Sequence, residues 1–475
     1  MKILSAVAPA SYGTNGADPP VLPVAASQLQ IIFEWVGLLP LAIYLSGNGL
    51  SHWLVGQTSL AGFIGVSFFP RLGILESLAT FLREGADFLD RASSVSELRH
   101  TVWDANWGSV FPCANGAASD ILTRYVIPKA RYIEIPTDLA AMIAANEHVR
   151  NPEERKDSAV IVETSNNSKG QTNENVGGPH FSRYQTLYIL DCTIDAGKRK
   201  TDSPFVTWFF FLIEVLFILS LLGACVSTIL LGLYGTAAAI LISIAFRVAR
   251  HSIKVIRPPR YLESNEANQA DAYMLTAIHE NASTWYLYRG SRAVVDGLVN
   301  KPMILDITAR PKTAMALALR GLALLQLLTM TYVAAQKGWD GVGLLVLIAV
   351  AWTLDYALYR DDKLAATWLR REGVSIKAWK CQFSGRTPML GAIQLLKSNT
   401  ISSWMDQMLA PSERREAWLK MLQLDMLQSD CPDFETLESK HALTGENDQS
   451  WVRNNWLLTR AAVKAIRVAT GEGTA

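Results

Sequence analysis

The sequence predicts an all-α polytopic membrane protein, a transmembrane bundle of about six spans arranged as three hairpins, with helical cytosolic segments. Residues 205–246 form a run of 42 residues in which Glu214 is the single charged side chain. A membrane helix needs about 20 apolar residues, so this run is long enough for two passes. Two further apolar runs, 314–335 and 341–358, flank a polar break. Runs this long are typical of spanning helices and not of barrel strands.

Composition favours a mixture of membrane spans and aqueous segments. The 475 residues carry 44 Lys plus Arg against 43 Asp plus Glu. This near balance argues against a nucleic-acid partner, which a basic excess would mark. A mean hydropathy of +0.16 is too polar for a chain that lies wholly in the membrane. We expect no cofactor and no metal, because the five scattered cysteines form no CxxC motif and are predicted to be unpaired thiols: Cys113, Cys192, Cys225, Cys381 and Cys431.

The N-terminal part of the chain is predicted to hold a tail and the first hairpin. Residues 1–28 are rich in Pro, Ala and Gly and are interpreted as a flexible tail. Residues 29–70 are predicted as the first membrane hairpin, with candidate spans at 29–45 and 53–69. The second span is the weaker one, because it is short and contains several polar residues and glycines.

A long polar region follows, and residues 71–204 are predicted as a cytosolic loop. Within it, 74–98 has leucines at helical spacing and charges on the other side, which indicates an amphipathic helix. Residues 151–179 are rich in Asn, Ser, Glu, Lys and Gly, and this composition predicts a disordered insertion.

The remaining chain is predicted as two more hairpins separated by cytosolic helices. Residues 205–250 are the second membrane hairpin and 314–359 are the third. Residues 251–313 are interpreted as a helical connector, and 360–475 as a helical C-terminal region. Basic residues gather where the spans of these two hairpins begin and end, and the positive-inside rule puts those flanks in the cytosol. If both early segments span, the N-terminus is cytosolic too.

The connector offers a tempting motif that fails. Met274, Ile278, Trp285 and Tyr288 fall on one face of a helix, which predicts a helix packed against the membrane bundle. His279 and Glu280 begin a zincin-like pattern, but position 283 is a serine where a second histidine is required, so a zinc protease is excluded.

Charged side chains inside the predicted spans are the candidate site residues. Each costs about 2.5–3.5 kcal/mol at a helix centre on insertion scales. Glu214 is interpreted either as a neutral carboxyl hydrogen-bonded in the bundle or as a proton donor or substrate contact in a cavity. Arg320 and Asp355 fall at similar depth in neighbouring antiparallel spans, so a salt bridge between them is expected. Glu214 and Asp355 are the candidate catalytic residues, with Arg320 as the partner of Asp355.

The C-terminal helix, residues 450–470, suggests a second lipid contact. It carries four basic residues and no acid, with Val452, Trp456 and Ile466 available for insertion into an anionic cytosolic leaflet. The alternative is a helix docked on the protein's own cytosolic face. The expected partners are therefore the lipid bilayer and, at this helix, anionic lipid; a membrane enzyme or exporter would add a lipophilic small molecule.

One block of sequence resembles a known group of proteins. The stretch Glu280-Asn-Ala-Ser-Thr-Trp-Tyr-Leu-Tyr-Arg-Gly-Ser-Arg-Ala-Val-Val-Asp-Gly-Leu-Val-Asn-Lys-Pro-Met-Ile304 is similar to a segment of uncharacterised multi-pass membrane proteins of filamentous ascomycete fungi. The similarity extends across roughly residues 205–375. The resemblance implies a fungal multi-pass protein, in the context of biosynthetic genes for lipophilic natural products. It supplies no catalytic or binding residues.

Three functions remain open on the sequence. An accessory membrane protein of lipophilic natural-product metabolism fits the absence of Walker A, GxGxxG and GxSxG motifs. A membrane-embedded cyclase or isomerase, acting on an isoprenoid or polyketide, needs only placed carboxyls and leaves almost no linear motif. A small-molecule exporter is the third choice, since internal repeats and broken helices are not evident.

Overall fold

The protein is built around a β-sheet, so the all-α prediction is wrong. The computed structural model describes residues 30–45, 50–65, 69–71, 73–94, 100–136, 183–195, 204–263, 271–336, 338–358, 360–397, 399–427 and 446–472. Within them, seven strands form one mixed sheet in the order β2-β1-β6-β7-β4-β9-β3. The predicted insertion at 151–179 and most of the predicted N-terminal tail lie outside the described residues.

The sheet collects strands from all three regions that the sequence analysis assigned to the cytosol. Its central strands are long, and β4 pairs in parallel with β7 and antiparallel with β9. The strands are β1 (Thr101–Asp104), β2 (Val110–Pro112), β3 (Arg131–Ile133), β4 (Gln185–Ile194), β6 (Ala272–Ala277), β7 (Thr284–Gly290) and β9 (Val374–Phe383). These regions therefore form one body rather than separate helical loops.

The predicted connector helix is instead the antiparallel pair β6–β7. Met274 and Tyr288 are cross-strand partners, so they share a face in the sheet as they would on a helix. Trp285 lies on the opposite face of the same strand and is fully buried there. Aromatic and β-branched residues make up most of β7 and favour the pleated conformation. The helical spacing was a coincidence of a few positions in an alternating pattern.

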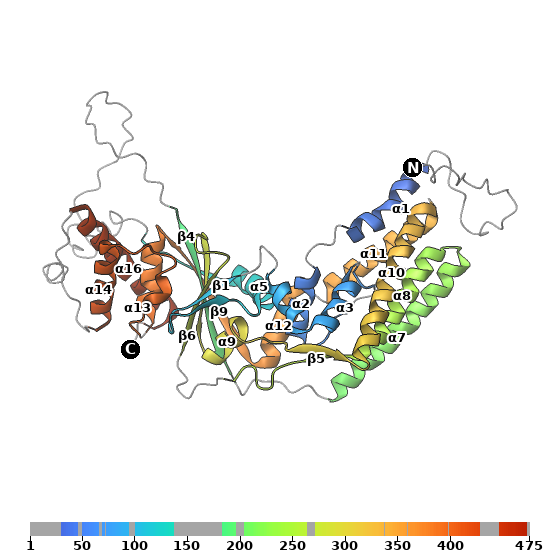
Figure 1. Ribbon diagram of the computed structural model, residues 1–475, viewed down its shortest axis with the longest axis horizontal. Coiled ribbons are helices and arrows are strands. Elements are labelled where there is room, and N and C mark those ends of the chain that lie inside the picture. The colour runs from blue at the N-terminus through green and yellow to red at the C-terminus, as the bar shows by residue number, and fades with distance from the viewer. Residues whose placement is uncertain are drawn as a thin grey trace, which may run out of the picture.

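Helices cover both faces of the sheet. One face packs against α13 (Arg386–Leu396), α14 (Glu413–Leu427) and α16 (Glu446–Thr470), and the other against α5 (Gly116–Val126), α9 (Arg292–Val299) and α12 (Asp361–Glu372), as Figure 1 shows. Val452, Trp456 and Ile466 of α16 are almost completely buried in this core. The C-terminal helix is thus docked on the protein itself, and the residues expected to enter lipid are not available for it.

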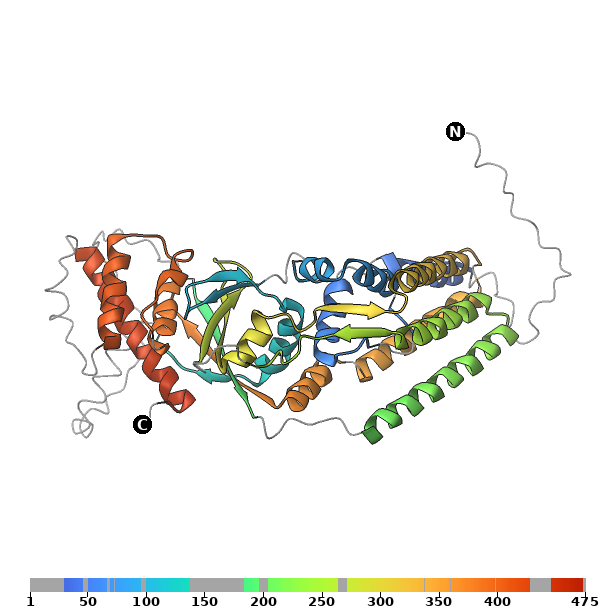
Figure 2. The same ribbon diagram turned by 60° about the horizontal axis from the view of Figure 1, so that its bottom comes forward.

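An elongated helical bundle extends from the other end of the molecule (Figures 1 and 2). It contains α1 (Gln30–Leu45), α7 (Pro204–Leu230), α8 (Tyr234–His251), α10 (Lys312–Gln336) and α11 (Trp339–Leu358). Among the described residues, three stretches are long and apolar enough to cross a membrane: Leu212–Leu230, Lys312–Gln336 and Trp339–Glu372, which contains α11. The six-span arrangement is therefore wrong as well.

The second predicted span, 53–69, does not cross as a helix, and its helix lies where the body meets the bundle. Its helix α2 (Leu50–Ala61) has only 12 residues, about 18 Å at 1.5 Å per residue, too short for a bilayer. Leu54 and Leu60 are buried, and α2 packs closely on α5, where Gly56 leaves no room for a side chain against Ala117. The predicted first hairpin thus contributes a single helix, α1, to the bundle.

Two elements join the bundle to the body. The predicted amphipathic helix at 74–98 is divided at Gly85 into α3 (Ile74–Glu84) and α4 (Ala86–Ser94), and α3 packs its apolar face along α10. A two-stranded ribbon of β5 (Ile253–Ile256) and β8 (Asp306–Ala309) connects α8 and α10 to the sheet region (Figure 2). Short 3-10 helices, Ile127–Lys129 and Ser403–Met405, complete the described elements.

Candidate functional site

Glu214 is part of an ion-pair cluster between α7 and α8. The Arg247 Nη1 atom lies 2.6 Å from the Glu214 Oε1 atom, and the Arg250 Nη2 atom lies 3.2 Å from it. The Arg247 side chain is 3% exposed and its guanidinium lies over the ring of Phe217. The sequence analysis found no cation at the level of Glu214. Both arginines stand more than thirty residues later, and only the antiparallel packing of α7 on α8 brings them to this carboxylate.

Asp355 and Arg320 are both ion-paired, but not to each other. The Asp355 Oδ2 atom lies 3.2 Å from the Arg71 Nε atom, and the Arg320 Nε atom lies 3.4 Å from the Glu76 Oε1 atom. The expected Arg320–Asp355 salt bridge is therefore replaced by two others. Arg71 and Glu76 supply the partners, and the sequence analysis assigned both to the cytosolic loop 71–204.

These charges lie at one level of the bundle. Asp340, in the first turn of α11, accepts hydrogen bonds from the backbone N–H groups of Gly235 (2.6 Å) and Thr236 (2.7 Å), which sets the hairpin tips side by side. On each of the four hairpin helices, one charged residue lies 16 residues from the helix end at the hairpin tip, which is about 24 Å at 1.5 Å per residue. This charged layer consists of Glu214, Arg250, Arg320 and Asp355.

A small pocket beside the charged layer does not provide a substrate site. It lies between α2, the residues that follow α2, and the end of α11, with Trp53, Phe69 and Phe246 among its apolar walls and Asp355 at its edge. Its free space is about that of one water molecule. An isoprenoid or polyketide intermediate does not fit into it.

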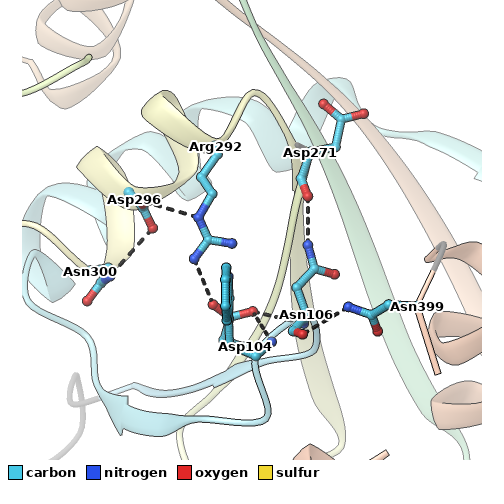
Figure 3. A network of polar contacts seen from close by, with 8 residues as sticks. Asp104, Asn106, Asp271, Arg292, Asp296, Asn300 and Asn399 are labelled. Carbon is cyan, nitrogen blue, oxygen red and sulfur yellow. Dashed lines mark hydrogen bonds and ion pairs between the residues drawn. The ribbon is translucent and has the colours of Figure 1, made fainter. Parts of the chain in front are cut away.

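The body contains a second polar cluster, at the end of β1 (Figure 3). The Asp104 Oδ1 atom accepts the backbone N–H groups of Asn106 (2.9 Å) and Trp107 (3.2 Å), and its Oδ2 atom accepts a hydrogen bond from Arg292 (3.1 Å). Arg292 also lies 3.5 Å from the Asp296 carboxylate on its own helix, α9. An aspartate that accepts two following N–H groups fixes a tight turn, here residues 105–109.

The same turn is held from the α13 side. Lys397, just after α13, donates hydrogen bonds to the carbonyl oxygens of Ala105 (2.5 Å) and Ile401. Asn399 donates to the carbonyl oxygen of Asn106 (2.9 Å), while the Asn106 side chain donates to that of Asp271 (2.7 Å). Figure 3 shows Asn106 between these two partners.

Burial perturbs the titration of this cluster. Desolvation lowers the pKa of Lys397 to about 7, against the opposing field of Asp104. Desolvation also raises the pKa of Asp104, which the Arg292 guanidinium opposes. A lysine and an aspartate tuned in this way are typical of acid–base sites. Here, however, the Lys397 residue is only 2% exposed and its ammonium is bonded to backbone carbonyls, so a substrate has no access to it.

The one large side chain that this cluster presents to solvent is Trp107. It is 60% exposed, and the Arg292 guanidinium carbon lies 5.4 Å from its ring centroid. A preorganised turn that exposes a tryptophan is the arrangement expected of a binding anchor. The sequence reasoning missed it because its residues span almost 300 positions. The local signal was Asp104-Ala-Asn-Trp-Gly108, an aspartate-led turn with a glycine at φ 74°.

No cofactor site stands out in the part of the chain that is described. It contains no group of three or more His, Cys, Asp or Glu side chains that could hold a metal ion. Four of the cysteines are buried free thiols: Cys113, Cys192, Cys225 and Cys381. Comparison of the chain with protein-family models, curated proteins and solved structures finds no match.

Proposed function

We propose that the protein is an integral membrane protein whose helical bundle anchors the mixed α/β body at one surface of a bilayer, in an accessory and non-catalytic role. One observation carries the membrane assignment. The stretch Leu212–Leu230 of α7 has a mean hydropathy of 2.3, yet only 11% of it is buried in the protein. Water would be an unfavourable neighbour for so much apolar surface, and lipid is a favourable one.

The bundle geometry suggests where the bilayer lies. About 24 Å separates the charged layer from the hairpin tips, close to the ~30 Å thickness of a hydrocarbon core. Glu214 and Asp355 then stand near the edge of the bilayer and not at its centre. The basic flanks are on the body side, which the positive-inside rule assigns to the cytosol.

The number of crossings in this arrangement is odd. Gly37 of α1 packs against Gly341 at the tips, whereas α2, which begins at Leu50, lies where the body meets the bundle. The chain therefore passes from the tips to the body between these residues. The pairs α7–α8 and α10–α11 each leave the body and return to it. Four helices, α7, α8, α10 and α11, thus run the whole way between the two ends, and α1 starts at the end opposite the body.

Two features support an accessory role over a membrane-embedded enzyme. Each of the three candidate residues from the sequence is held in an ion pair, and the pocket beside Asp355 is too small for a lipophilic substrate. The exposed, preorganised Trp107 turn suits a protein that recruits a soluble partner to the membrane. The link to natural-product biosynthesis rests on the resemblance alone.

The proposal is tested first by extraction of membranes with alkaline carbonate. The protein should remain in the membrane pellet and be released by detergent. Release by carbonate alone would overturn the membrane assignment.

The accessory role is tested by complementing a deletion strain and profiling its lipid-soluble metabolites. Trp107→Ala should behave like the deletion, with the same metabolites present in lower amounts. Glu214→Gln should restore the amounts of the unaltered strain. Trp352→Ala, which removes an exposed tryptophan of α11, is the matched control and should also complement. Accumulation of an uncyclised precursor in Glu214→Gln would favour the enzyme instead.

A further inference from the structure

A row of tyrosines crosses one face of the sheet, where α5 and its neighbours cover it only in part. Tyr286 of β7 is the cross-strand partner of Tyr188 of β4, which is the partner of Lys380 of β9. Lys380 is in turn the partner of Tyr132 of β3. Residues that face each other across neighbouring strands project to the same side. The rings of Tyr188 and Tyr286 are stacked with centroids 5.7 Å apart.

The row is open to solvent at its Tyr132 end and beside Tyr188, at Tyr184. Tyr132 is 61% exposed, and Tyr184, four residues before Tyr188 and therefore on the same side of the chain, is 52% exposed. Tyr188, Tyr286 and Lys380 are half-buried. We call this surface the tyrosine face, made of Tyr132, Tyr184, Tyr188, Tyr286 and Lys380.

The tyrosine face turns toward the side of the sheet from which the bundle extends. It continues the face that packs on α5, α9 and α12, because Tyr288 and Ala378 of that core lie two residues from Tyr286 and Lys380. Helices α5 and α12 pack in turn on α2, the link toward the bundle. Figure 1 shows α5 and α2 between the sheet and the bundle, and α13, α14 and α16 on the far side.

We propose that the tyrosine face rests on the headgroup layer of the same bilayer that the bundle crosses. Tyrosine is enriched at this depth because its ring is apolar and its hydroxyl is polar. Lysine suits the same layer, since its stem lies along apolar surface while its ammonium meets anionic headgroups. The surface lies on the side of the sheet from which the bundle extends. This inference rests on the proposed membrane anchoring, and the experiment separates the two.

The test uses an environment-sensitive fluorophore on single cysteines in the full-length protein, reconstituted in vesicles that contain a headgroup nitroxide lipid. Cys431→Ser removes the cysteine outside the described residues, and the other four thiols are buried. Labels at Tyr132→Cys and Tyr184→Cys should lose emission to the nitroxide. A label at Lys420→Cys, exposed on α14 over the opposite face, should keep its emission.

A label at Ser220→Cys, exposed on α7, reports on the anchoring itself through a quencher attached to the lipid chains. Quenching at 220 without quenching at 132 and 184 would overturn the tyrosine face and leave the anchoring intact. Failure at 220 would overturn the anchoring and the inference together. Protection of 132 and 184 in detergent as well as in vesicles would show that another segment, such as residues 137–182, covers the face, and would also overturn it.

Lipid charge gives a second readout. Lys380→Glu reverses the charge at the centre of the tyrosine face. In vesicles with anionic lipid, the label at position 132 should therefore be quenched less in the Lys380→Glu protein than in the protein that keeps Lys380. In zwitterionic vesicles the two should differ little. If the two proteins are quenched equally in anionic vesicles as well as in zwitterionic ones, Lys380 does not contact anionic headgroups.

Discussion

Glu214 holds two arginines of the neighbouring helix, and this pairing changes what its substitution should do. Arg247 is buried beside it, and removal of one member of a buried pair leaves the other charge without its carboxylate. We expect Glu214→Leu to lower the free energy of unfolding by about 3 kcal/mol, the low end for broken buried pairs. Glu214→Gln should lose less, because its amide oxygen still accepts a hydrogen bond from Arg247.

The measurement is thermal unfolding of the detergent-purified variants. Arg83→Leu, which removes an exposed arginine from an ion pair on α3, is the control and should change little. Equal stability of Glu214→Leu and the unaltered protein would show that the pair contributes nothing.

Lys397 makes the stability of the body depend on pH. Its folded pKa of about 7 lies below the ordinary value of 10.5, so between these pH values the unfolded chain binds a proton that the folded chain does not. The free energy of unfolding therefore rises with pH through this window, and the penalty of burying the ammonium is fully present below pH 7. Relative to Lys397→Met, which cannot titrate, the unaltered protein should gain stability from pH 7 to pH 9.5.

The check is a pair of denaturant titrations at several pH values, with fluorescence of the body tryptophans as the signal. A difference between the two proteins that stays constant over this pH range would contradict the lowered pKa.

At the scale of elements, the cap that α11 provides for α8 is a clear target. The Asp340 carboxylate accepts the N–H groups of Gly235 and Thr236 and the Thr236 hydroxyl, all of them buried. Asp340→Ala should cost about 1–2 kcal/mol, the usual range for a lost N-cap. Asp340→Asn keeps one acceptor oxygen and should cost less. Thermal unfolding of the two variants in detergent compares them, and equal losses would show that the carboxylate does not act as a cap.

The elements also show what sequence patterns could and could not predict. The run 205–246 covers most of α7 and α8, with the turn at Gly232, whose φ of 76° suits glycine. The strands were missed because their partners are remote: β4 pairs with β9, almost two hundred residues later. In β6 almost every residue is buried, so its apolar pattern does not alternate clearly and local periodicity cannot separate it from a helix.

The candidate site was predictable only in part, for a related reason. Apolar runs located Glu214, Arg320 and Asp355 as the charges that need an explanation. Their partners come from other segments, and the sequence analysis placed Arg71 in the predicted cytosolic loop, outside the bundle. The Trp107 turn had a local signal in Asp104, but Arg292 and Lys397 join it only through the sheet.

At the scale of the whole molecule, the bundle and the body together predict an unusual arrangement of the ends. The sequence alone, with two early spans, puts the start of the chain in the cytosol. In the structure only α1 of that pair enters the bundle, and its contact of Gly37 with Gly341 lies at the hairpin tips. Helices α7, α8, α10 and α11 return the chain to the body each time they leave it. If the bundle anchors the protein in a bilayer as proposed, we therefore expect an odd number of crossings between the start of α1 and the C-terminal helices.

Reporter fusions test this arrangement. Reporters at Lys200 and Lys380, which precede and follow the two hairpins in the sequence, should report the cytosolic side, and a reporter at Gln336 should report the opposite side. The decisive fusion is one placed ahead of Gln30, which should agree with Gln336, because α1 starts at the tips. Agreement of that fusion with Lys380 would show that α1 does not cross and that Gly37 meets Gly341 from a re-entrant helix. The membrane anchor would then consist of the four helices that carry the charged layer. The apolar surface of α1 would have to pack on protein instead of on lipid.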